Sequence, residues 1–74
     1  MLRLTIKILN KRFDIMVKKE QRISEVLKVL KENQMFFYDV NQMMVYSIRN
    51  QEYVNKKLTF KQGDIFSGDI LELK

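Results

Sequence analysis

Residues 2–17 read LRLTIKILNKRFDIMV, and their pattern defines the first element of the fold. Apolar residues stand at positions 2, 4, 6 and 8 and again at 13, 15 and 17, with mostly polar residues between them. Alternation with a period of two puts one set of side chains on the buried face of a strand and the other set in water. The polar break Asn10-Lys11-Arg12 separates the two runs, and Asn tolerates left-handed turn geometry. We therefore predict a β-hairpin that begins at the first residues.

The apolar period changes directly after this hairpin. Four apolar residues are spaced as i, i+3, i+4 and i+7, which places them on one stripe of an α-helix. They are Ile23, Val26, Leu27 and Leu30. The stripe predicts a helix of about three turns that ends near Asn33 and needs a sheet to pack on. Ser24 would cap its first turn, whereas Arg22 would cap it poorly if the helix begins earlier.

The second half of the chain predicts further strands and a long connection. Residues 43–48 form the third strand, and we expect its more apolar set of side chains to face the core. That set is Met44, Tyr46 and Ile48, and the opposite set is Met43, Val45 and Ser47. Tyr53-Val54 is a short fourth strand, and residues 70–73 form the last one. The connection between them has expected anchors at Leu58, Phe60 and Ile65 and turns at Gly63-Asp64 and Gly68-Asp69.

Length and element order limit the architecture. The 74 residues suffice for one domain, residues 1–74, and not for two. A hairpin, a helix and further strands in so short a chain give two layers, a mixed sheet with the helix across one face. The first and last strands are rich in core-type residues, so we expect them to be parallel central neighbours joined by a right-handed crossover. This is an α+β fold, a β-grasp with a four- to five-stranded sheet and one main helix.

The apolar residues, taken as an ordered set, resemble ubiquitin across the whole chain. The set comprises Phe13, Ile15, Val17, Ile23, Val26, Leu30, Leu58, Ile65, Leu71 and Leu73. The ending Ile65-Phe66-Ser67-Gly68-Asp69-Ile70-Leu71-Glu72-Leu73 resembles the YukD-like family of Gram-positive bacteria, whose members accompany type VII (WXG-type) secretion systems. This resemblance implies a small accessory protein that binds secretion machinery, such as a secretion ATPase or a membrane component. Ubiquitin and the sulfur carriers end in Gly-Gly, whereas this sequence ends Leu71-Glu72-Leu73-Lys74, so we expect no conjugation. A carrier whose Gly-Gly tail follows Lys74 is a third alternative.

Composition argues against an enzyme. With neither His nor Cys, the chain lacks the usual general base, the thiol nucleophile and the ligands of iron–sulfur clusters. Two glycines are too few for a phosphate-binding loop. Asp64 and Asp69 each follow a glycine, and their spacing supplies too few oxygen ligands for calcium, so we interpret both as turn residues. We expect no catalytic residue, no metal and no cofactor.

The positive charge leaves a second function open. The net charge is +5, and basic residues cluster at Lys11-Arg12, at Lys18, Lys19 and Arg22, and at Lys56-Lys57. Such clusters suit an acidic protein, an anionic lipid or a nucleic acid. Base stacking also needs exposed aromatic residues, and Phe13, Tyr46 and Phe60 stand at core-type positions. A nucleic-acid-binding module is therefore the alternative, and binding of nucleic acid or membrane is the less favoured prediction.

The favoured prediction is a protein-docking surface. Partners of ubiquitin mostly contact an apolar patch on the exposed side of the sheet, and the resemblance places Met43 and Val45 at the equivalent position. Arg3, Lys7 and Glu72 would lie beside them and set the orientation of the partner. A second surface consists of Phe36, Phe37 and Tyr38: if these side chains do not all fit inside, the remainder forms a contact loop or a weak homodimer surface. Neither a long apolar stretch nor a signal-peptide pattern is present, so we expect a cytoplasmic protein.

Overall fold

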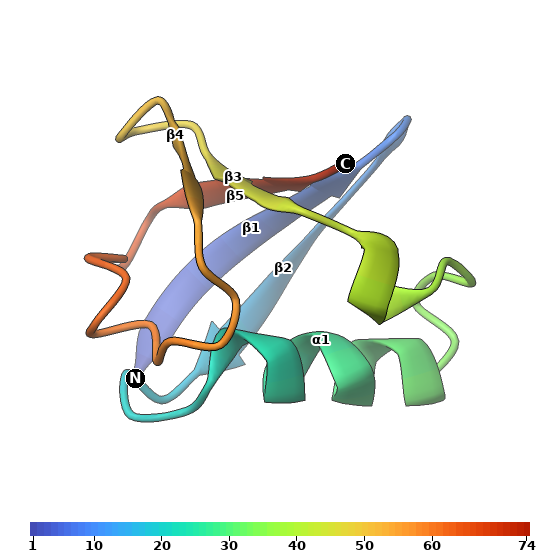
Figure 1. The fold of residues 1–74 in the computed structure, drawn as a ribbon, viewed down its shortest axis with the longest axis horizontal. Helices are drawn as coiled ribbons and strands as arrows, with labels where there is room; N and C mark the ends of the chain where they lie inside the picture. Colours follow the sequence, from blue (N-terminus) through green and yellow to red (C-terminus); the bar gives the residue numbers. More distant parts are fainter.

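The predicted hairpin is the first element of the computed structural model, which describes residues 1–74 (Figure 1). Strands β1 (Leu2–Ile8) and β2 (Lys11–Val17) pair antiparallel, with Leu4 opposite Ile15 and Ile6 opposite Phe13. The turn lies at Leu9-Asn10, one residue earlier than the predicted break, and Leu9 rather than Asn10 has a positive φ of 53°. The strand register explains why the turn is shifted: Ile8 pairs with Lys11, so only Leu9 and Asn10 are left for the loop.

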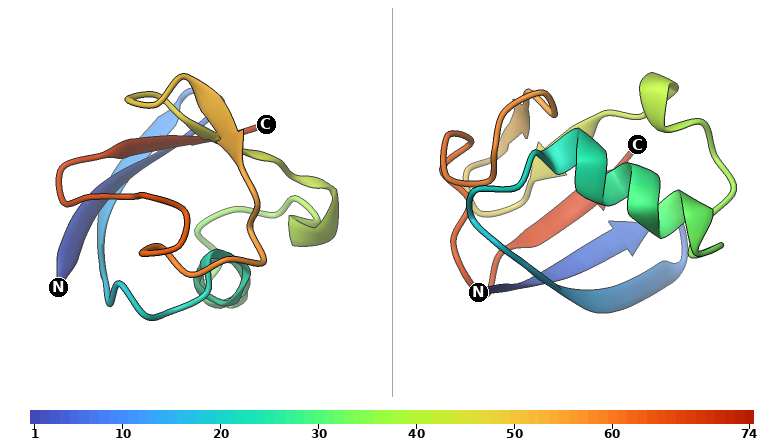
Figure 2. Two further views of the ribbon diagram at one scale, coloured as in Figure 1. Left: turned by 60° about the vertical axis from the view of Figure 1, so that its left-hand side comes forward. Right: turned by 90° about the horizontal axis from the view of Figure 1, so that it is seen from below.

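The remaining elements complete a five-stranded mixed sheet with the order β2-β1-β5-β3-β4. They are α1 (Ile23–Glu32), the 3₁₀ turn η1 (Val40–Gln42), β3 (Val45–Ser47), β4 (Glu52–Val54) and β5 (Ile70–Leu73). Strands β1 and β5 are parallel neighbours at the centre of the sheet, and the other pairs are antiparallel. Helix α1 lies across one face (Figure 2). The predicted β-grasp is confirmed, with five strands.

The core fills the space between this face and α1. Its fourteen buried apolar residues come from every long element and from the connections. They are Leu4, Ile6, Ile8, Val17, Ile23, Val26, Leu27, Phe36, Met43, Val45, Phe60, Ile65, Leu71 and Leu73. Each fully buried aliphatic or aromatic side chain contributes about 1.5–3 kcal/mol to folding. The predicted anchors Phe60 and Ile65 therefore fix the connection from β4 to β5 in this core, whereas Leu58 is only partly buried.

The first turn of α1 is satisfied by backbone carbonyls rather than by a side-chain cap. Arg22, not Ser24, is the N-cap residue, and its side chain accepts nothing from the helix. The N–H of Ile23 donates to the carbonyl of Leu58 (3.0 Å), and the N–H of Ser24 donates to that of Lys56 (2.8 Å). A helix needs partners for its first N–H groups, and here a distant loop supplies them.

The predicted faces of the third strand are wrong. Met43 and Val45, expected on the exposed face, are only 7% and 1% exposed, and Ser47 is also buried. The reason is the pairing with β5, where Val45 lies opposite Leu73 and therefore on the same side of the sheet. Met44, Tyr46 and Ile48, expected in the core, lie on the opposite side. Neither Met43 nor Val45 is accessible to a partner in this fold.

Candidate interaction surface

The face of the sheet opposite α1 carries exposed apolar side chains. We define the apolar patch as Met44, Tyr46 and Ile48 from β3 and its flanks, Tyr53 from β4 and Ile70 from β5. Strand register puts these residues together, since Tyr46 lies opposite Tyr53 and the N–H of Ile48 donates to the carbonyl of Ile70 (3.1 Å). Met44 is 53% exposed and Tyr53 is 51% exposed. Three exposed and two half-buried apolar side chains, Tyr46 and Ile70, thus share the outer face of the sheet.

Two tyrosines and a lysine give the centre of this patch a fixed shape. The rings of Tyr46 and Tyr53 pack edge to face, with centroids 5.1 Å apart and planes at 73°. The ammonium of Lys74 lies 4.6 Å from the centroid of Tyr46 and 3.7 Å from a carboxylate oxygen of Glu72. Such aromatic and cation–π contacts favour a defined orientation of the two rings. The patch therefore presents a partly ordered apolar surface with charge at its margin.

The neighbouring part of the same face is polar and mostly basic. Arg3, Thr5 and Lys7 of β1 lie there, with Asp14 of β2 opposite Thr5. The Thr5 hydroxyl donates to Oδ1 of Asp14 (2.8 Å), and the Arg3 guanidinium donates to Oδ2 (3.2 Å). The Thr5 hydrogen bond, followed by that of Arg3, lowers the pKa of the Asp14 carboxyl. Asp14 thus engages Arg3, while Lys7 remains exposed beside the patch.

Of the five predicted contact residues, the structure brings three to this face. Arg3, Lys7 and Glu72 lie on it, whereas Met43 and Val45 point into the core. The five patch residues were not predicted as contacts. The alternation of β5 places Leu71 and Leu73 inward, but the side chains of β3 follow from its register with β5, which the local sequence pattern does not give.

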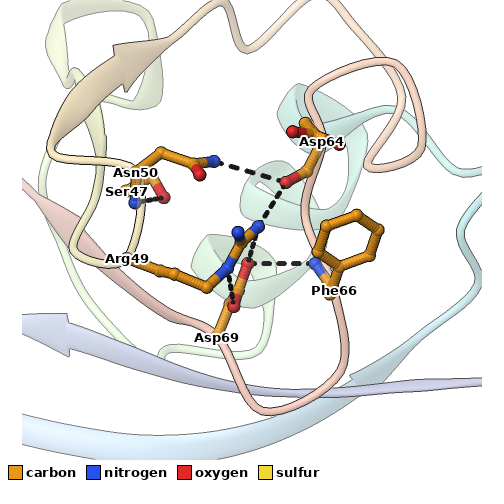
Figure 3. Close-up of polar contacts among 6 residues, drawn as sticks. All are labelled: Ser47, Arg49, Asn50, Asp64, Phe66 and Asp69. Carbon is orange, nitrogen blue, oxygen red and sulfur yellow. Dashed lines mark hydrogen bonds and ion pairs between the residues drawn. The ribbon is translucent and has the colours of Figure 1, made fainter.

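A polar cluster lies where β3 ends and the segment leading into β5 begins (Figure 3). Its residues are Ser47, Arg49, Asn50, Asp64, Phe66 and Asp69. Arg49, just after β3, donates from Nε to Oδ1 of Asp69 (2.8 Å) and from Nη2 to the carbonyl of Asp64 (2.7 Å). Asp69 also accepts from the N–H of Phe66 (2.9 Å), and the Arg49 guanidinium lies 4.6 Å from the Phe66 ring centroid. The hydrogen bond to Asp69 raises the pKa of Arg49. This cluster fixes the turn after β3 to the segment that leads into β5.

The two aspartates considered as cation ligands in the sequence, Asp64 and Asp69, both belong to this cluster. The Asp69 carboxylate is engaged by Arg49 and by the backbone of its own turn, and Asp64 occupies a turn with a φ of 61°. No group of three or more His, Cys, Asp or Glu residues is arranged to hold a metal ion. The helices of this chain also lack the length and apolarity needed to cross a bilayer.

A second exposed apolar group lies at the far end of the hairpin. Phe36 enters the core, but Phe37 is 76% exposed and Tyr38 is about half exposed. They line a hollow of about 430 Å³ together with Leu9 and neighbouring residues. Phe36, Phe37 and Tyr38 therefore do not all fit inside, so Phe37 and Tyr38 remain available for the predicted second contact surface.

Comparison with known proteins defines the class of fold. No protein-family model and no curated protein matches this chain. A de novo designed protein based on ubiquitin superposes with a TM-score of 0.78 at 26% identity, over 99% of this chain and 85% of that one. The ubiquitin-like domain of an Arabidopsis thaliana protein gives 0.78 at 15% identity, over 99% and 74%. A chain from the crystal structure of ATBAG1 in complex with HSP70 gives 0.79 at 14% identity, over 100% and 40%. The chain has a ubiquitin-like β-grasp fold.

Proposed function

We propose that this chain is a non-catalytic protein-interaction module that docks through its apolar patch. The observation that carries the proposal is one continuous apolar face, on which Met44, Ile48 and Tyr53 are exposed. Tyr46 and Ile70, which lie between them, are half-buried. Exposed apolar patches with polar rims mark contact sites on soluble proteins. Tyrosine and methionine suit such a site, since Tyr gives large rigid contacts and Met adapts its shape. The neighbour solved in complex with HSP70 gives general support for protein binding by this fold.

Arg3, Lys7 and Glu72 have a different role in this proposal. They lie on the same face, outside the apolar patch, where charge affects association rate and orientation more than affinity. The excess of basic over acidic groups there favours a partner with an acidic margin. Met43 and Val45 are buried on the core side of the same strand region and make no contact with the partner.

Capture from a lysate of the native host tests the docking surface. The bait is the wild-type chain, and the test bait is a Met44→Asp/Tyr53→Asp double variant, since both side chains are half exposed. Lys28→Asp on α1 is the control, because Lys28 is exposed and lies on the other layer, outside the apolar patch. Proteins retained by wild type and by the Lys28 variant, but lost with the double variant, support the patch. Equal recovery by all three baits would exclude it.

The finer proposal is an accessory role in a Gram-positive type VII secretion system, in the cytoplasm, with a secretion ATPase or a membrane component as partner. It is supported by the resemblance of residues 65–73 to the YukD-like family. In the structure these residues stabilise the fold, because Ile65, Leu71 and Leu73 are buried in the core and Asp69 accepts a hydrogen bond from Arg49. Purified soluble domains of the ATPase and of the membrane components, titrated against the wild-type chain, test this role. Failure of all of them to bind would remove it while leaving the docking surface intact.

One observation favours the alternative, a module that binds single-stranded nucleic acid. Tyr46 and Tyr53 are on the open face rather than in the core, and Lys74 lies against both rings. Aromatic rings beside cations are the usual platform for base stacking. A labelled oligonucleotide titration at increasing salt tests it, because phosphate contacts make affinity fall steeply with salt concentration. Absence of binding at low salt would exclude this function.

A further inference from the structure

Strand β2 has one edge that no other strand covers. It is the outermost strand beside β1, and α1 lies over the face rather than against this edge (Figure 2). On β1, the N–H of Thr5 donates to Asp69 and the carbonyl of Arg3 accepts from Gly68, so the odd-numbered residues of β1 bond toward β5. The even-numbered residues of β1 therefore bond to β2, through pairs such as Leu4 with Ile15.

The backbone groups on the free edge follow from this alternation. Phe13, Ile15 and Val17 use their N–H and C=O groups toward β1, and the residues between them point theirs outward. The outward groups belong to Arg12, Asp14 and Met16. Unpaired N–H and C=O groups in a row form a template for one more strand.

An apolar groove runs beside this edge, between β2 and α1. It has a volume of about 310 Å³. Its lining consists of Ile15, Met16, Val17, Gln21, Val26, Val29 and Leu30. Alternate side chains of an added strand point to one face of the sheet, and those that lie opposite Phe13, Ile15 and Val17 would enter this groove. The edge and the groove therefore form one site for an extended apolar segment.

The basic residues at both ends of β2 favour an acidic segment as the added strand. Lys11 and Arg12 stand at one end of β2, and Lys18 and Lys19 follow its other end. The one acidic residue between them, Asp14, is bound to Arg3 and Thr5. A second copy of this chain, pairing antiparallel along the same edge, would bring basic ends together, and like charges opposite one another destabilise a sheet. An acidic segment would instead gain from both ends.

We propose that the free edge of β2 binds an extended peptide segment of a partner protein, with alternating apolar residues and acidic residues at both ends, as an additional strand. This site lies on a different side of the molecule from the apolar patch and is independent of the proposed function. The peptide residues opposite Arg12, Asp14 and Met16 make the backbone hydrogen bonds, and the alternate residues fill the groove.

A synthetic peptide tests the site directly. The probe reads Glu-Asp-Val-Thr-Ile-Thr-Val-Asp-Glu, so that Val, Ile and Val face the groove and the two Thr residues bond to the edge. One control peptide has Lys at the four end positions, and another has Pro in place of both Thr residues, which removes the donating N–H groups. Binding is followed by backbone amide NMR of the whole chain. We expect saturable shifts and slowed exchange at the amides of Arg12, Asp14 and Met16. The Lys-ended peptide should bind about tenfold more weakly, and the Pro peptide should not bind.

Variants of the protein locate the same site. Val29→Asp should weaken binding of the acidic peptide by about tenfold, whereas Phe66→Asp, of matched exposure in the connection before β5, should leave it within about twofold. If Val29→Asp impairs folding, the exposed pair Lys18→Glu/Lys19→Glu replaces it and should shift preference toward the Lys-ended peptide. Unperturbed amides at about 1 mM peptide, or equal affinity for acidic and Lys-ended peptides, would overturn the proposal. Concentration-dependent shifts of the three amides without peptide would assign the edge to a second copy and overturn it too.

Discussion

The guanidinium of Arg49 and the carboxylate of Asp69 form the most buried ion pair of the molecule, with Nε 2.8 Å from Oδ1 and the Asp69 side chain only 4% exposed. Arg49 follows β3 and Asp69 precedes β5, so the pair aligns the two strands that carry most of the apolar patch. Loss of the guanidinium would leave a buried carboxylate with fewer partners, which is costly in a low-dielectric interior.

We therefore expect Arg49→Ala to lower the free energy of unfolding by about 2 kcal/mol. Urea denaturation measures it, with Arg12→Ala as the control because Arg12 is exposed and forms no ion pair. The double variant Arg49→Ala/Asp69→Asn should recover part of the loss, since it removes the unpaired charge. Additive losses in the two single variants would show that the pair is not coupled.

Gly63 is required by space rather than by backbone conformation. A Cβ placed there would meet Cγ1 of Val54 at 2.9 Å, closer than van der Waals contact allows. Gly63→Ala should therefore destabilise the fold by about 1–3 kcal/mol. Val54→Ala in the same chain should relieve the clash, so that the double variant is more stable than the sum of the single effects predicts. Thermal and urea unfolding of the four proteins give the coupling energy.

Asp14 should make stability depend on pH. Its pKa is lower in the folded chain than in the unfolded chain, so the stabilisation is fully present above the unfolded value of about 3.9. It is lost as the pH falls through the folded value. Asp14→Asn should be less stable than wild type at pH 7, and the difference should shrink in acid. Thr5→Val, which keeps the shape but removes the donated hydrogen bond, should reduce the same acid dependence in melting curves between about pH 2 and 7.

Lys56 holds η1 in place. Its ammonium donates to the carbonyl of Met43 (2.6 Å) and to that of Val40. Lys56→Met should destabilise the chain by about 1–3 kcal/mol, since two carbonyls lose a charged donor. Amide exchange at Gln42 and Met43 should accelerate more than exchange in β1. The exposed neighbour Lys57 is the matched control, and an equal effect of Lys57→Met would contradict the specific role of Lys56.

The regions with an unambiguous period were predictable from sequence. The hairpin, the helix stripe and the final strand all turn the selected residues toward the core, although Leu2, Phe13, Ile15 and Leu30 are only partly buried. The third strand was not predictable by the same rule, because both of its sets contain apolar residues. Its larger side chains, Met44, Tyr46 and Ile48, favoured the wrong face. Ser47 is acceptable inside because its hydroxyl accepts from the N–H of Asn50 (3.2 Å), a contact that requires the folded turn.

The residues of the candidate surface were predictable only in strands whose inward-facing side chains can be identified from the sequence. Arg3, Lys7 and Glu72 belong to β1 and β5, whose inward sets are clear, and their placement on the outer face followed. Most apolar members of the surface belong to β3, its flanks and β4, and these two strands are only three residues each and too short to show a period. Their orientation depends on a partner strand far away in the sequence, and local pattern does not contain that information.

The central position of β5 has a consequence for how this chain folds. Positions 5 and 70 are neighbours in the parallel ladder, so the sheet is completed only by closing a loop of nearly the full chain length. Before β5 inserts, β1–β2 and β3–β4 are two separate hairpins, and an isolated hairpin is marginal in water. Insertion joins them in one step, so we expect a cooperative transition with most of its barrier in chain closure. Any binding partner therefore meets either the complete surface or none of it.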